Sequence, residues 1–175
     1  MADKGGDFGY GMMSFIFAVR DFMAPRRKIL DEVSIEPGFC VLDFGCGSGA
    51  YVADASEMVG SSGKVYALDA HPMAIRMVKK LVEKRRLPNV ETIQSDSATG
   101  LENNTVDVVL LYDTFHDLQE PRKVLAEMNR VLKSGGKLSF SDHHLGHEQI
   151  ISSVTDDGMF QFVGKGQKTY TFSPS

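Results

Sequence analysis

Phe-Cys-Val-Leu-Asp-Phe-Gly-Cys-Gly-Ser-Gly-Ala-Tyr, residues 39–51, is the stretch around which the rest of the chain can be organised. Its apolar start at 39–42 predicts a strand that is buried on both faces of a parallel sheet. Three alternating glycines follow, and Ala50 opens an expected helix. Glycines allow a sharp turn close to a ligand, and the N-terminus of the helix directs free N–H groups into that turn. The stretch therefore predicts a nucleotide-type ligand site.

The identity of the ligand depends on the residue before the glycines. Gly45, Gly47 and Ala50 satisfy the dinucleotide pattern G-x-G-x-x-G/A, which alone is weak evidence. Asp43 changes the balance, because a carboxylate beside the turn would repel a pyrophosphate and attract a ligand that carries an ammonium group and a sulfonium. A turn that serves only to reverse the chain is the alternative.

The segment Val-Leu-Asp-Phe-Gly-Cys-Gly-Ser-Gly at 41–49 resembles motif I of class I S-adenosylmethionine-dependent methyltransferases. Arg-Val-Leu-Lys-Ser-Gly-Gly at 130–136 resembles the Arg-Val-Leu-Lys-Pro-Gly-Gly turn of this family, with serine in place of proline. The His-Asp-Leu loop at 116–118 is most similar to the broad group related to the quinone-biosynthesis C-methyltransferases. The resemblance implies S-adenosylmethionine as cofactor, bound by residues of the turn and of the later strand ends: Asp43, Gly45, Cys46, Gly47, Gly49, Asp69, Ala70, Asp96, Ser97 and Tyr112.

Two carboxylates after later strands have specific expected roles. Asp69 lies about twenty residues beyond the last glycine, the separation expected for a carboxylate that binds a ribose diol. A helix cap is the alternative for Asp69. The resemblance implies that Asp96 hydrogen-bonds the adenine amino group, although acidic and serine residues also occur in ordinary loops.

The alternation of strands and helices predicts the fold. Expected strands begin at Phe39 and cover 64–68, 89–94, 106–112 and 137–141; helices are expected from Pro25, at 50–59, from Pro72, from Pro121 and at 144–157. A hairpin of 159–163 and 168–172 follows. The prediction is an α/β, Rossmann-like doubly wound sheet in one domain, 1–175, mostly parallel with a C-terminal antiparallel hairpin and helices on both faces. Residues 1–24 are expected either to cover the sheet or to form a lid over the cofactor.

Composition limits the classes of partner. The chain has 175 residues, 42% hydrophobic and 24% charged, with a net charge of −4, which is typical of a soluble globular protein without general attraction to nucleic acid or anionic membranes. A cationic helix face within 76–86 is interpreted as solvated, with an RNA contact as the alternative. Cys40 and Cys46 are not expected to form a disulfide. No leader or membrane-length apolar run is visible, so a cytoplasmic protein that acts on a small-molecule acceptor is expected. A monomer and a homo-oligomer are both left open.

Methyl transfer is an in-line displacement that requires alignment and exclusion of water. A general base is needed only if the acceptor loses a proton. His116 is the first candidate, and Asp113, Asp142, His143 and His144 are the others.

No metal is predicted, although Asp113 and the Asp142-His143 pair end neighbouring strands and His143 and His147 have helical spacing. Capping of the last helix by Asp142 is the simpler explanation. A short-chain dehydrogenase is excluded, because no tyrosine has lysine four positions later. A non-catalytic module that binds the cofactor and acts with a protein or RNA partner is the remaining alternative.

Overall fold

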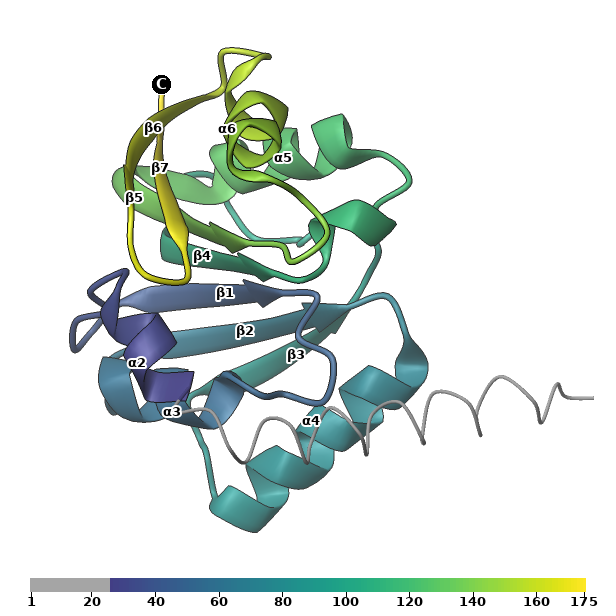
Figure 1. Ribbon diagram of the computed structural model, residues 1–175. Coiled ribbons are helices and arrows are strands. Elements are labelled where there is room, and N and C mark those ends of the chain that lie inside the picture. Colours follow the sequence, from purple (N-terminus) through teal and green to yellow (C-terminus); the bar gives the residue numbers. More distant parts are fainter. Residues whose placement is uncertain (1–25) are drawn as a thin grey trace, which may run out of the picture.

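A seven-stranded sheet forms the centre of the computed structural model, which describes residues 26–175 (Figure 1). The strand order is β3-β2-β1-β4-β5-β7-β6. The first five strands of this order are parallel, and β7 runs antiparallel to both β5 and β6. The strands are β1 Cys40–Phe44, β2 Lys64–Asp69, β3 Val90–Gln94, β4 Val106–Tyr112, β5 Leu132–Ser141, β6 Phe160–Lys165 and β7 Tyr170–Pro174. The predicted fold class is confirmed. The expected lid, residues 1–24, lies outside the described residues.

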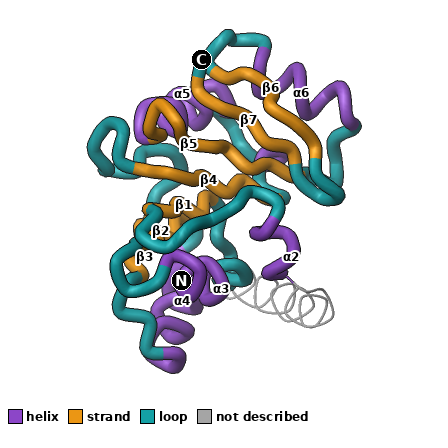
Figure 2. Tube along the Cα trace, turned by 90° about the vertical axis from the view of Figure 1, so that its left-hand side faces the viewer, coloured by secondary structure: helices purple, strands orange, loops and turns teal. Residues whose placement is uncertain are grey.

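Helices cover both faces of the sheet. Figure 2 shows α2 (Arg26–Asp31), α3 (Val52–Val59) and α4 (Pro72–Arg85) grouped beside β1 to β3, and α5 (Pro121–Val131) and α6 (His147–Thr155) beside β5 to β7. Successive residues of a strand point to opposite faces. Val41 of β1 therefore packs in the cluster with α2 and α3, whereas Leu42 packs in the cluster with α5. None of the helices within 26–175 is long and apolar enough to span a membrane.

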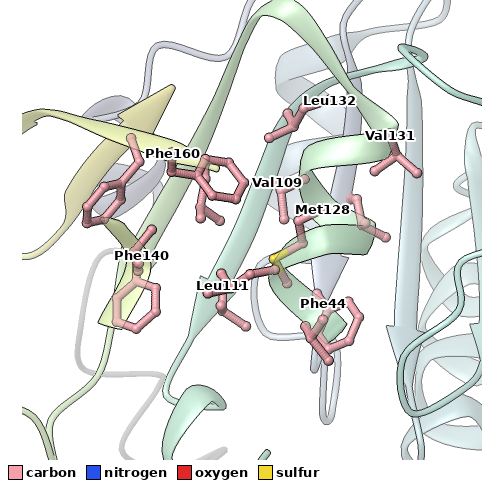
Figure 3. Close-up of a cluster of buried hydrophobic side chains, with 14 of the residues drawn as sticks. Phe44, Val109, Leu111, Met128, Val131, Leu132, Phe140 and Phe160 are labelled. Carbon is pink, nitrogen blue, oxygen red and sulfur yellow. The ribbon is translucent and has the colours of Figure 1, made fainter. Parts of the chain in front are cut away.

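The larger core cluster lies between α5, α6 and the central strands. Figure 3 shows Met128 of α5 beside Leu111 of β4, and Val131 and Val109 belong to the same cluster of buried side chains. Phe140 of β5 extends this cluster toward the C-terminal hairpin and is completely buried. The buried residues of α5, Val124, Leu125, Met128 and Val131, are thus the ones at helical spacing that face the sheet. Both cysteines are free, as predicted.

Strand β5 begins at Leu132, five residues before the predicted start at Lys137. Leu132 pairs with Val106 and Lys137 pairs with Val108, so residues 133–136 form a bulge opposite Asp107. The Lys133 Nζ donates to both carboxylate oxygens of Asp107, at 2.7 and 2.8 Å. The predicted turn is therefore present, but as an irregularity inside a strand.

The last helix, α6, begins at His147 instead of His144. His143 consequently lies before the helix, so the alternative of a helical pair of His143 with His147 is not realised. Gly146 occupies the N-cap position, and its N–H donates to Gln149 Oε1 at 2.8 Å. The expectation that Asp142 caps this helix is therefore wrong.

Candidate functional site

The site lies where the sheet changes direction, at the carboxyl ends of β1 and β4. These strands are neighbours, but the connections that follow them run to opposite sides of the sheet, which opens a crevice between two loops. Gly45 in the first loop has φ +78°, and a Cβ at this position would collide with the side chain of Thr114 in the second. The backbone of Gly45 can approach the second loop only because glycine lacks a side chain.

Backbone hydrogen bonds hold the glycine turn. The N–H groups of Gly45 and Cys46 donate to the Leu68 carbonyl at 2.8 and 2.9 Å, and the Gly49 N–H donates to the Cys46 carbonyl at 2.8 Å. Gly47 has φ +51°, and apart from its own two chain neighbours no described residue has an atom within 4 Å of the place a Cβ would occupy. The turn is thus attached to β2 on one side and open at Gly47.

Asp69, at the end of β2, connects this turn to the next loop. Its Oδ2 accepts the Gly47 N–H at 2.9 Å, and its Oδ1 accepts the His71 N–H at 2.8 Å. Helix α4 is capped by His71, whose Nδ1 accepts the Met73 N–H at 3.1 Å. The helix-cap alternative for Asp69 is therefore wrong. Each of its carboxylate oxygens keeps acceptor capacity for a ligand.

Asp43 is buried beneath the turn with 3% of its surface exposed. Its Oδ2 has no hydrogen-bond partner within residues 26–175. Burial, and next the negative charge of Asp69, raise the pKa of Asp43 to about 7, against an opposing contribution from Arg26. A buried carboxylate without a partner is unfavourable, and a cationic ligand would compensate for it. This orphaned oxygen therefore fits a ligand that carries positive charge.

A cavity of about 770 Å³ extends from the glycine turn to the loops after β4 and β5. Five of the predicted cofactor-binding residues line it: Gly45, Asp69, Ala70, Asp96 and Ser97. Four of the candidate bases, Asp113, His116, His143 and His144, line it as well. Other lining residues were not predicted from the sequence, among them Gln119 and Glu120. Their position after β4 was the available signal, because loops at the carboxyl ends of parallel strands meet at one edge.

Four predicted residues, Asp43, Cys46, Gly47 and Gly49, do not line the cavity. Tyr112 also lies away from it: its hydroxyl is 2.7 Å from Ser139 Oγ in the buried interior, and its ring contacts Tyr51 edge-on with centroids 4.9 Å apart. The structure thus places Tyr112 among the packing residues.

Asp96 and Ser97 lie together at the side of the cavity after β3. The Ser97 hydroxyl donates to Asp96 Oδ1 at 2.9 Å, and Ser97 is buried whereas Asp96 is exposed. This bond fixes one carboxylate oxygen and leaves the other available to a donor such as an amino group.

Two aspartate–histidine pairs cross between the loops that follow β4 and β5. Asp142, after β5, accepts the backbone N–H of His116 at 3.0 Å and lies 2.9 Å from its Nδ1. Asp113, after β4, accepts the backbone N–H of His143 at 3.1 Å and lies 2.8 Å from its Nδ1. Each loop therefore holds the histidine of the other, and the two loops form one wall of the cavity.

Ligand atoms of Asp113, Asp142 and His143 lie within 4.8 Å of one another, which is the one group of this kind within residues 26–175. His143 Nδ1 already lies at hydrogen-bonding distance from Asp113, and Asp142 accepts bonds from the His116 loop. A metal ion would have to replace these bonds. The prediction that no metal is used stays a prediction.

Comparison with known proteins identifies the family. Residues 42–140 match the methyltransferase domain family. The chain is 31% identical over 130 residues to the demethylmenaquinone methyltransferase of Bacillus mycoides. The aligned residues cover 74% of this chain and 55% of the relative. It is 27% identical to the ubiquinone/menaquinone biosynthesis C-methyltransferase UbiE of a Marinomonas species, over 79% of this chain and 56% of the relative. The chain thus spans about half the length of these curated relatives.

Solved structures agree with the sequence relatives. The crystal structure of a SAM-dependent methyltransferase from Aquifex aeolicus superposes with a TM-score of 0.74 at 29% identity, over 90% of this chain and 96% of the other. A methyltransferase structure from Methanococcus maripaludis, at 16% identity and a TM-score of 0.78, shows the same fold. The chain belongs to the methyltransferase domain family, as a class I methyltransferase with S-adenosylmethionine as cofactor and a relationship to the quinone C-methyltransferases.

Proposed function

We propose that the protein transfers the methyl group of S-adenosylmethionine to a small-molecule acceptor bound beside the loops after β4 and β5. The observation that carries this proposal is the continuous cavity, which has Gly45 and Asp69 at one end and His116, His143 and His144 at the other. Its volume is sufficient for a small ligand as well as part of the cofactor. The names of the relatives, demethylmenaquinone and ubiquinone/menaquinone methyltransferases, support a ring-type quinol acceptor.

In this proposal the cofactor lies along the strand ends. Asp69 accepts hydrogen bonds from the ribose hydroxyls with its remaining lone pairs, and Asp96 accepts one from the adenine amino group. The positive charge of the cofactor lies near Asp43, whose Oδ2 has no partner within residues 26–175. Cys46, Gly47 and Gly49 shape the turn, and Ala70 and Ser97 border the adenosine portion. The sulfonium supplies an activated methyl group, so the protein mainly has to align the acceptor and exclude water.

The proposed role of Asp43 predicts a pH-dependent affinity. The pKa of Asp43 in the folded protein, about 7, lies above its ordinary value of 3.8. Between these two pH values the ligand-free folded protein binds one more proton than the unfolded chain does, so its free energy of unfolding falls as pH rises. A bound cation favours the ionised carboxylate. Affinity for S-adenosylmethionine should therefore rise by at least about tenfold between about pH 5 and pH 8, which calorimetry can measure.

The control for this prediction is Asp43→Asn, in which the pH dependence should disappear. S-adenosylhomocysteine keeps the ammonium group but lacks the sulfonium. The pH dependence of its affinity therefore shows which of the two charges interacts with Asp43. Equal pH dependence in the wild-type protein and in Asp43→Asn would contradict the proposed role.

The charge of the cavity predicts the charge of the acceptor. Five carboxylates line it, and within residues 26–175 no lysine or arginine does. The carboxylates are those of Asp69, Asp96, Asp113, Asp117 and Glu120. Apolar side chains also line it, among them Phe44, Leu68, Leu118 and Val124. A neutral or cationic acceptor with an apolar ring fits this surface, and an anionic one is repelled.

A panel of phenols, quinols, amines and thiols, assayed with labelled S-adenosylmethionine, tests the proposed function. Adding a carboxylate to an accepted compound should lower kcat/KM by at least about tenfold, because one like-charge contact costs more than about 1.4 kcal/mol. The matched control is the isosteric carboxamide, which should retain activity. No methylation of any compound would favour the non-catalytic alternative, which no feature of the cavity supports at present.

His116 is proposed as the general base for acceptors that must lose a proton. It lines the cavity at the end opposite the ribose-binding region, and its side chain is 21% exposed. An imidazole can accept a proton near neutral pH. An acceptor that is already deprotonated, such as a free amine, would not need this residue.

A further inference from the structure

The two crossed aspartate–histidine pairs look alike in their bonding, but they differ in burial. The side chain of Asp142 has no exposed surface. In the other pair, the side chain of Asp113 is 40% exposed and that of His143 is 58% exposed. Asp142 also accepts a third bond, from the His144 N–H to Oδ1 at 2.9 Å. The Asp142 carboxylate is therefore a rigid acceptor, fixed by two backbone N–H groups from two different loops.

Asp142 is ionised in the folded protein. Burial pushes the pKa of its carboxyl upward, but the hydrogen bond from His116 and the backbone N–H groups of His144 and His116 together outweigh burial, and the pKa is lowered. A carboxylate can only accept hydrogen bonds. The His116 Nδ1 beside it must therefore carry the proton, and in the neutral ring Nε2 is then the atom with the free lone pair.

We infer that Asp142 is a positioning residue for the proposed reaction, which holds His116 in the tautomer and orientation that make Nε2 the proton acceptor. The inference rests on the proposed function and extends it to a residue that does not line the cavity. As the acceptor atom bonds to the methyl carbon, the carbon–sulfur bond breaks with its electron pair going to sulfur. The proton of the acceptor atom moves to His116 Nε2, which becomes part of an imidazolium.

Several groups face the His116 ring and affect its charged form. Asp142 lies at Nδ1, and Asp117 Oδ2 lies 3.5 Å from Nε2. The rings of His144 and His143 have centroids 4.0 and 5.7 Å from that of His116. Carboxylates on both sides stabilise the imidazolium once it forms, whereas protonation of the neighbouring histidines opposes it. Asp117 is 83% exposed, so Asp142 provides the fixed geometry.

The tautomer can be observed without any assay of activity. Nitrogen NMR of the imidazoles in the wild-type protein should show His116 with a proton on Nδ1 and none on Nε2, assigned by comparison with His116→Gln. This measurement comes first, because Asp142→Asn places an amide N–H₂ against a backbone N–H and could disturb the loop. A neutral His116 with its proton on Nε2 would overturn the inference.

The kinetic test uses Asp142→Asn with an acceptor that must lose a proton. We expect kcat to fall about 100-fold with little change in KM for the cofactor, because general-base catalysis contributes about 10² or more. The kcat–pH profile should also shift toward lower pH, since the imidazolium loses its buried anionic partner and the neutral, proton-accepting ring is then favoured. An acceptor amine that is already deprotonated should be affected much less.

Asp107→Asn is the matched control. Asp107 also accepts a backbone N–H, from Cys40 at 2.8 Å, but it lies at the opposite end of β4 from the cavity. The Asp107→Asn variant should be less stable than the wild-type protein, but it should not show the selective fall in kcat that is expected of Asp142→Asn. Unchanged kcat in a folded Asp142→Asn variant would overturn the inference. If the wild-type protein methylates nothing, the proposed function fails, and the NMR result still decides whether Asp142 positions His116.

Discussion

Asp69→Ala is expected to weaken the binding of S-adenosylmethionine by about 2–4 kcal/mol, because two charge-assisted hydrogen bonds to the ribose hydroxyls are lost. This corresponds to a loss of affinity of more than about tenfold. The structure adds a second reason, since Asp69 also accepts the Gly47 N–H and so holds the glycine turn in place. Calorimetry on the folded variant measures the loss, and thermal unfolding shows whether the turn itself has become less stable.

The two contributions can be separated with a ligand that lacks the ribose diol. A dideoxy analogue of S-adenosylhomocysteine should bind the wild-type protein more weakly than the parent compound does. In Asp69→Ala the two compounds should bind almost equally, because the interaction partner of the diol is already absent. If removal of the diol lowers the binding free energy by the same amount in the wild-type protein and in Asp69→Ala, Asp69 does not contact the ribose. Its role is then confined to the turn.

Phe140→Ala is expected to lower the free energy of unfolding by about 3–5 kcal/mol, the loss typical of a large side chain removed from a packed core. Phe140 is completely buried in β5. Its ring contacts Phe115 and Phe172, with centroids 5.2 and 6.3 Å away. Phe115 directly precedes His116, so the resulting cavity should also loosen the loop that carries the proposed base. Denaturant titration measures the loss of stability.

Phe162→Ala is the matched control, since Phe162 lies on the edge strand β6 and is 39% exposed. Its ring contacts Phe172 with centroids 5.7 Å apart, as a core residue would, but much of its surface stays in water. Its loss should be about 1 kcal/mol or less. Similar losses in both variants would show that the cluster around Phe172 is not the stabilising core that its burial indicates.

The sequence was sufficient for the fold because its signals are local. The apolar run before Gly45, the glycine turn and Asp69 at the end of β2 all follow from spacing along one segment of chain. The start of β5 could not be predicted in this way. Its bulge depends on Lys133 bonding Asp107, a residue of the neighbouring strand. A turn inside a strand and a turn before a strand have the same local sequence.

The candidate site was predicted less completely. Asp142 and His116 were both considered, but their partnership joins two loops and has no periodic signal in the sequence. The resemblance implied that Tyr112, at the end of β4, binds the cofactor. The alternation of side chains along that strand instead directs it to the core beside Tyr51. Which face a terminal strand residue takes depends on register, which the sequence motif does not specify.

The close approach of Gly45 to Thr114 has a kinetic consequence. The Thr114 hydroxyl donates to the Tyr112 carbonyl at 3.0 Å, so its side chain is held against the glycine turn and neither loop can move without affecting the other. A cofactor seated on the turn therefore also fixes one boundary of the space that receives the acceptor. We expect catalysis to follow a compulsory order, in which the methyl donor enters first and its demethylated product leaves last.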